Sequence, residues 1–233
     1  MIPIRDANRS STTPHLTRIL IIVNIVIFLV TLLPELSKPY WLFVLLGAAP
    51  SPTLRQFTLN YGVIPSQVLQ GQRLFTFITS MFLHGDLWHL GGNMLYLHIF
   101  GDNVEDRFGH ARYLLFYFLS GFAASVLFIL TNIGSDIPAI GASGAISGVL
   151  GAYLVLYPKA RVLTLVFLGW VFPVLIPAVF FLGFWFILQL FYGMVTLGLS
   201  AVTSIAYWAH IGGFIAGLVF GLAWRSRRPE REF

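Results

Sequence analysis

The sequence predicts an all-α fold, a polytopic membrane bundle of six transmembrane helices. Of its 233 residues, 57% are hydrophobic and only 10% are charged, and 22 are Phe. A water-soluble domain of this length does not need so much apolar surface, so composition alone indicates a membrane protein. The number of helices follows from six apolar runs that polar or basic segments separate.

The first apolar run covers residues 16–33 and follows a polar segment, residues 1–15, which we expect to be an unstructured cytoplasmic tail. A cleaved signal peptide is the alternative for this run. No cleavage-site pattern of small residues follows it, so we predict a membrane span. Residues 34–86 form a long connection. Its apolar piece at 39–47 is too short to cross about 30 Å of hydrocarbon, so it either extends the first span or lies at the interface.

The remaining spans follow in order through a membrane domain that covers residues 16–224. They are expected at residues 87–101, 113–130, 143–157, 178–196 and 206–224. Residues 162–177 contain two prolines and are expected to be an interfacial or partly helical loop. A basic cytoplasmic tail, residues 225–233, follows the sixth span.

The Lys and Arg residues set the expected orientation. Eleven of the 14 lie in segments that a six-span topology puts on one side, and only Lys38, Arg55 and Arg73 lie on the other. Because basic residues concentrate on the cytoplasmic side, both termini are predicted to be cytoplasmic in a plasma (inner) membrane. The basic residues lie at the edges of apolar runs, so the net charge of +5 indicates a protein of the lipid bilayer and not one that binds nucleic acid.

Three of the predicted spans carry polar residues at a similar depth. At 1.5 Å per residue, Ser143 lies about 24 Å above the inner end of its span, His210 about 22 Å and His89 about 20 Å. Small residues also recur on two of these spans, where they let helix backbones pack closely in lipid. They are Gly144, Gly148, Gly151 and Ala152 in the fourth span and Gly213, Gly217 and Gly221 in the sixth. We therefore expect Ser143 and His210 to be neighbours.

A serine beside a histidine indicates nucleophilic catalysis. A serine hydroxyl is a weak nucleophile unless a base accepts its proton, and His210 would be that base. Attack of Ser143 on a peptide carbonyl creates an oxyanion, which needs hydrogen-bond donors. Amides in the first turn of the fourth span would supply some of these donors, and the side chains of His89 and Asn93 would supply others. No carboxylate is expected at that depth, so we predict a Ser-His dyad.

Three separated motifs resemble those of the rhomboid family of intramembrane serine proteases. They are GASG around Ser143, AHIGG around His210, and HGDLWHLGGN, which contains His89 and Asn93. The motifs occur in the family's order, and the resemblance covers about residues 16–224. It implies a six-span protease that cleaves single-span transmembrane proteins at or near the outer side of the membrane. It also implies Ser143 as nucleophile and His210 as base. The oxyanion hole would be formed by His89, Asn93 and the Ser143 amide.

One position near the serine differs from the family's pattern. An aromatic residue often lies four residues after the nucleophile, and here that residue is Ser147. Another ring, such as that of Tyr207 or Trp208, is then expected to position His210. Ser147 is also the alternative nucleophile, but it lies one helical turn deeper than Ser143 and farther from water.

Other residues of the resemblance lie outside the catalytic motifs. Glu105 and Arg107 match the family's Glu-x-Arg, which has a structural role. The family often has a Trp-Arg pair in the first loop, and Arg73 is too far from the histidine motif to be its equivalent. Arg73 is therefore given no role.

Other classes of protein fit these residues less well. A zinc protease would need H-E-x-x-H, which His84 and His89 do not form, and the sequence has no cysteine. An aspartyl protease would need two buried aspartates. The G-x-S-x-G turn of soluble hydrolases fails at Ala145. A transporter would show broken helices in matching halves, and the only interrupted segment lies around Pro173. A catalytically inactive relative that acts as a binding scaffold would lack the serine or the histidine. We predict neither a metal nor a cofactor, and nothing in the sequence assigns an oligomeric state.

Overall fold

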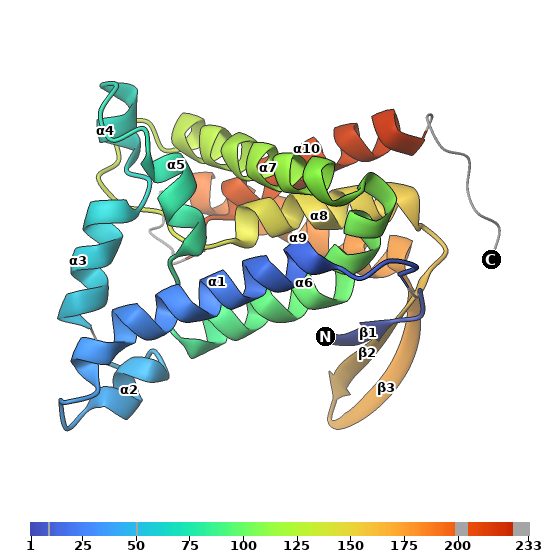
Figure 1. Ribbon diagram of the computed structural model, residues 1–233, viewed down its shortest axis with the longest axis horizontal. Helices are drawn as coiled ribbons and strands as arrows, with labels where there is room; N and C mark the ends of the chain where they lie inside the picture. The colour runs from blue at the N-terminus through green and yellow to red at the C-terminus, as the bar shows by residue number, and fades with distance from the viewer. Residues whose placement is uncertain (9, 50, 199–204, 226–233) are drawn as a thin grey trace.

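The computed structural model describes residues 1–8, 10–49, 51–198 and 205–225, and these residues are mostly helical. Long helices run along one common axis, with a group of short helices at one end and a small sheet at the other (Figure 1). The long helices are α1 (His15–Leu32), α6 (Leu87–Phe108), α7 (His110–Thr131), α8 (Ser143–Leu156), α9 (Ala178–Gly198) and α10 (Tyr207–Arg225). Each expected span therefore has a corresponding helix.

Four segments of the described chain are long and apolar enough to cross a membrane. They are His15–Glu35, His110–Thr131, Ala178–Leu197 and Tyr207–Arg225. The chain is thus a multi-pass membrane protein. The last two turns of α6 carry several charged residues, and α8 has only 14 residues, a length of about 21 Å. The expected number of six spans is therefore not confirmed and stays a prediction.

A three-stranded antiparallel sheet is the main departure from the expected all-α fold. Its strands are β1 (Ile2–Asp6), β2 (Arg161–Leu168) and β3 (Trp170–Pro177), in the order β1-β2-β3. The expectation of an unstructured N-terminal tail is therefore wrong for residues 2–6. The expectation of a partly helical loop at 162–177 is also wrong, whereas its interfacial position stays a prediction. β2 and β3 are rich in β-branched and aromatic residues, which favour strands, and two prolines disfavour a helix there. The basic tail lies beyond Arg225, outside the described residues.

Asp6 ties this sheet to the helices. Its carboxylate accepts a hydrogen bond from the Tyr153 hydroxyl on α8 at 2.6 Å and another from the Asn103 side-chain amide on α6 at 2.8 Å. Burial, together with the nearby Asp102 carboxylate, raises the pKa of Asp6 from 3.8 to about 7, although the bond from Tyr153 opposes the shift. The sheet is thus held against the bundle by a group whose charge changes near neutral pH.

α8 lies at the centre of the bundle and packs closely against α10. A Cβ atom on Gly213 would overlap the backbone carbonyl oxygen of Gly144, and one on Gly217 would overlap that of Gly148. Only glycine fits such contacts, because the two backbones themselves touch. The prediction that small residues bring these two helices together is confirmed.

Glu105 anchors the start of α1. Its buried carboxylate accepts hydrogen bonds from the backbone amides of Leu16 and Thr17, at 2.9 and 2.8 Å. A negative group at the N-terminus of a helix also interacts favourably with the helix dipole. Near the same end of the bundle, the Trp224 indole donates to the Arg107 carbonyl and links α10 to α6. The bonds to the Glu105 side chain agree with a structural role for the glutamate of the Glu-x-Arg motif, whereas the bond to Arg107 uses only its main chain.

Short helices occupy the long connection between α1 and α6. They are η1 (Leu33–Glu35), α2 (Trp41–Leu45), α3 (Pro52–Tyr61), α4 (Pro65–Leu69), α5 (Thr76–Thr79) and η2 (Ser80–Phe82). α2 is separate from α1, so residues 39–47 do not extend the first helix. The connection also braces the loop before α8. Val63 pairs with Ala139, and the Ser80 carbonyl accepts a hydrogen bond from the Gly141 amide at 2.9 Å.

Candidate active site

The turn into α8 depends on Gly141. Its φ of +122° is a conformation that residues with side chains rarely adopt, and a Cβ atom there would lie only 2.7 Å from Nε2 of His89. The turn can therefore approach the His89 ring closely only with glycine at this position. Two residues later, Ser143 begins the helix.

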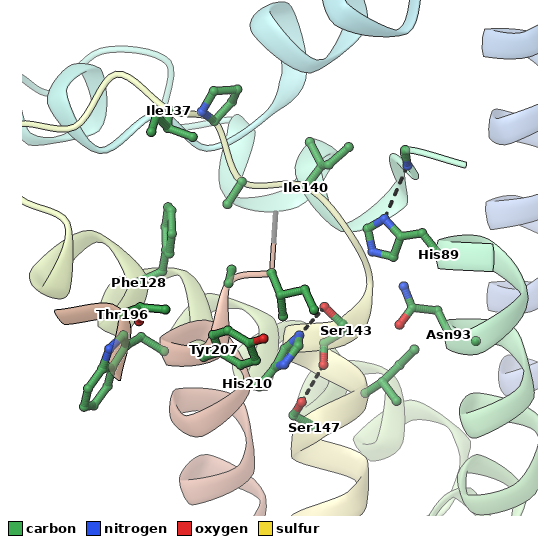
Figure 2. Close-up of a pocket in the computed structure, with 18 of the residues that line it drawn as sticks. His89, Asn93, Phe128, Ile137, Ile140, Ser143, Ser147, Thr196, Tyr207 and His210 are labelled. Atoms are coloured by element: carbon green, nitrogen blue, oxygen red, sulfur yellow. Dashed lines mark hydrogen bonds between the residues drawn. The ribbon is translucent and has the colours of Figure 1, made fainter. Parts of the chain in front are cut away.

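Ser143 and His210 form a hydrogen bond inside the bundle. The Oγ atom of Ser143 lies 2.9 Å from Nε2 of His210 (Figure 2). No side chain caps the N-terminus of α8, so the Ser143 hydroxyl is not used as a helix cap. The backbone contact between α8 and α10 brings the hydroxyl of one helix to the imidazole of the other.

Ser147, the alternative nucleophile, has its hydroxyl directed elsewhere. It is 1% exposed and donates a hydrogen bond of 2.6 Å to the backbone carbonyl of Ser143. Its proton is therefore held by a main-chain oxygen, whereas the Ser143 hydroxyl faces a potential base.

His89 and Asn93 lie on the side of Ser143 opposite His210 (Figure 2). The Gly85 amide donates to Nδ1 of His89 at 3.3 Å, so a neutral ring carries its proton on Nε2, the nitrogen next to Gly141. The side-chain nitrogen of Asn93 is buried and has no hydrogen-bond partner among the described residues. Together with the uncapped backbone amides of the first turn of α8, these groups place hydrogen-bond donors on one side of Ser143.

One cavity of about 970 Å³ is lined by the catalytic pair and by both side-chain donors, which are Ser143, His210, His89 and Asn93. This volume is near the upper end of the range for ligand pockets, about 300 to 1,000 Å³. Much of the remaining lining is apolar and comes from residues 137–140, which precede α8, and from α9 and α10. The cavity thus has a few polar groups that converge on Ser143 within apolar walls, which is typical of a substrate site.

Two residues of α9 also contact His210, although the sequence pattern did not single them out. The Oε1 atom of Gln189 lies 2.9 Å from Nδ1 of His210, and the centroid of the Trp185 ring lies 6.0 Å from that of the imidazole. A signal for Gln189 does exist in the sequence. It is the only amide side chain in the apolar run 178–198, and polar side chains within membrane helices are often functional.

The two rings expected to position His210 have other contacts. Tyr207 stacks on Tyr192 with centroids 5.5 Å apart, and the Trp208 indole donates to the Gly193 carbonyl at 3.1 Å. The expectation for Tyr207 and Trp208 is therefore wrong. Both rings instead join α10 to α9 at the cavity lining.

Known proteins with similar sequences are named as rhomboids. Residues 71–227 match the family model of the Rhomboid domain. Rhomboid protein 1, mitochondrial, of Saccharomyces cerevisiae is 34% identical over 150 residues, which cover 62% of this chain and 40% of that protein. RHOMBOID-like protein 4 of Arabidopsis thaliana is 34% identical over 170 residues, with coverages of 69% and 36%. Rhomboid protease GluP of Bacillus subtilis is 31% identical over 176 residues, with coverages of 76% and 31%. The chain thus spans less than half the length of each of these three relatives.

Proposed function

Because this chain belongs to the rhomboid family, we propose that it is an intramembrane serine endopeptidase that cleaves single-span transmembrane proteins. The observation that carries the proposal is the hydrogen bond of 2.9 Å between the Ser143 hydroxyl and the His210 imidazole. That contact supplies a nucleophile and a base in the lining of the cavity.

The reaction is acyl transfer in two stages. His210 takes the proton of the Ser143 hydroxyl as the oxygen attacks the peptide carbonyl, and a tetrahedral oxyanion forms. Its charge is stabilised by Nε2–H of His89, the Asn93 amide and the backbone amide of Ser143. His210 then gives the proton to the leaving amine, and the C–N bond breaks. Water, with its proton taken by His210, attacks the resulting ester. His210 returns that proton to the Ser143 oxygen as the ester bond breaks, which releases the second product and restores the serine hydroxyl.

The proposed topology has six spans, with both termini on the cytoplasmic side of a plasma (inner) membrane. It rests on the distribution of basic residues and on the helix found at each expected position. β1 and the end of α10 lie at the same end of the bundle, and the short helices of the first connection lie at the other (Figure 1). That arrangement is consistent with an even number of spans.

The test uses purified protein in detergent and two readouts. The first is covalent labelling by a fluorophosphonate, which bonds to an activated serine as fluoride leaves. The second is cleavage of a reporter protein with one transmembrane helix. Ser143→Ala and His210→Ala should each lower both signals by a factor on the order of 10⁴ to 10⁶. Ser147→Ala should stay within a few-fold of the unmodified protein. Full activity in either of the first two variants would contradict the proposal.

A further inference from the structure

Gln189 is a polar residue in an otherwise apolar part of α9. Its side chain is 9% exposed, and α9 faces the cavity and the lipid with aromatic and aliphatic residues. An amide buried without partners costs free energy, so its hydrogen bond to His210 is the contact that compensates for its burial. The 2.9 Å distance from Oε1 to Nδ1 is that of a well-formed N–H···O bond.

This contact determines which nitrogen of His210 carries the proton. A carbonyl oxygen only accepts hydrogen bonds, so Nδ1 must be the protonated nitrogen when it faces Oε1 of Gln189. A neutral imidazole has a single N–H group, and Nε2 is then left with a free lone pair. That lone pair faces the Ser143 hydroxyl at 2.9 Å. The opposite tautomer would direct an N–H group at the serine, and the ring would not accept its proton.

The same helix also restricts the orientation of the ring. Trp185 lies one helical turn before Gln189, and its ring is tilted by 33° to the imidazole of His210. The Trp185 ring limits movement of the imidazole out of its plane, while the bond to Gln189 limits rotation about the Cβ–Cγ bond. α9 therefore holds the base, although neither the base nor the nucleophile belongs to that helix.

We propose that Gln189 is a positioning residue for this chain's base, which makes the functional unit Ser143, His210 and Gln189. The inference rests on the proposed serine protease chemistry and adds a residue to it. Within the described part of the chain, Gln189 has no hydrogen bond to the serine or to the oxyanion donors, so it acts through His210. As His210 accepts the serine proton, the carbonyl dipole of Gln189 also stabilises the positive charge that develops on the ring.

A structural role is the competing account, since the same hydrogen bond joins α9 to α10. The two accounts differ in what a carboxylate at this position should do. A carboxylate keeps the acceptor and adds a negative charge beside the imidazole, which favours the protonated form of the ring. The other titratable groups that line the cavity are His89 and Tyr96 on α6, Asp86 at its start, and Tyr207 on α10. They are the same in every variant, so a change in pH profile reports on position 189.

The experiment compares Gln189→Met and Gln189→Glu with the unmodified protein. Met has nearly the length of Gln but no strong acceptor. Fluorophosphonate labelling and kcat for the single-span reporter should fall roughly 10- to 100-fold in Gln189→Met, with KM little changed. Gln189→Glu should recover most of the rate at high pH and move the acidic limb of the profile to higher pH. Tyr192→Phe, which removes a hydroxyl from the same helix and keeps the stacked ring, should match the unmodified protein.

Thermal unfolding of each variant separates positioning from folding. A Gln189→Met protein with a labelling rate within two-fold of the unmodified protein would overturn the inference. So would equal losses in the Met and Glu variants with an unshifted acidic limb, since a purely structural bond predicts that result. If Gln189→Met does not fold, the pH–rate profile of Gln189→Glu is the deciding measurement. An acidic limb at the pH of the unmodified protein would then overturn the inference. Retained labelling of Ser143→Ala would instead overturn the proposed function, so the two failures are distinguishable.

Discussion

Gly217 is a position outside the catalytic pair at which one added methyl group should disturb the candidate site. A Cβ atom there would overlap the carbonyl oxygen of Gly148 and lie 2.9 Å from the backbone nitrogen of Ala152. Both obstacles are main chain, so no side chain can turn away to make room. Because comfortable contacts to carbon begin near 3.5 Å, α10 must move away from α8 by on the order of 1 Å in Gly217→Ala.

That displacement has two measurable consequences. Overpacking of a tight interface costs about 1 to 3 kcal/mol, which corresponds to a fall in Tm of roughly 2 to 12 °C for a chain of this size. His210 lies two turns before Gly217 on the same helix, and its bond to Ser143 is already 2.9 Å long. An added 1 Å would break this bond, so kcat should fall about 10²-fold.

The assay is thermal unfolding in detergent together with cleavage of the single-span reporter. Gly183→Ala on α9 is the matched control, because a Cβ atom at that position meets nothing within 4 Å. That control should keep its activity and gain up to about 1 kcal/mol of stability from the better helix propensity of Ala. If Gly217→Ala unfolds and cleaves like Gly183→Ala, the close contact between α8 and α10 is not what positions the two side chains.

Two further predictions concern the oxyanion donors and the sheet. Asn93→Ala should lower kcat roughly 10²- to 10³-fold with little change in KM, measured on the same reporter, and an unchanged kcat would remove Asn93 from the oxyanion hole. Because the pKa of Asp6 is about 7 in the folded protein and 3.8 in its ordinary state, the folded protein binds more protons between these values and loses stability as pH rises through them. The partly exposed carboxyl should contribute about 1 kcal/mol, seen as a lower Tm at pH 8 than at pH 5. Asp6→Asn should remove this difference in Tm. If the variant shows the same difference between pH 5 and pH 8, another titratable group causes it.

The helices and the central pair of the site are predictable because they depend on local patterns. The length of an apolar run sets the bounds of a membrane helix, and α1, α7 and α9 begin and end close to the expected residues. That Ser143 and His210 lie close together is predictable from glycines that recur every four residues, because such a pattern lets two helix backbones pack in direct contact.

The rest of the structure depends on information that is not local. β1 is short and contains Pro3, and only its partner strand gives it regular structure. The contact of Gln189 with His210 depends on the rotation of α9 about its own axis, which an almost uniformly apolar helix does not reveal. For the same reason the ring beside His210 comes from Trp185, whereas the sequence favoured aromatic residues close to the histidine in the chain.

The sheet joins segments that are far apart in the sequence, so it can form only late in synthesis of the chain. Asp6 and Tyr153 are 147 residues apart, and a ribosome that adds 5 to 20 residues per second needs roughly 7 to 30 s to make the chain between them. Helices α1, α6 and α7 are therefore synthesised before β2 exists for β1 to pair with. Pairing of β1 with β2 therefore comes after these helices have been made, and it stabilises their arrangement rather than directing their insertion.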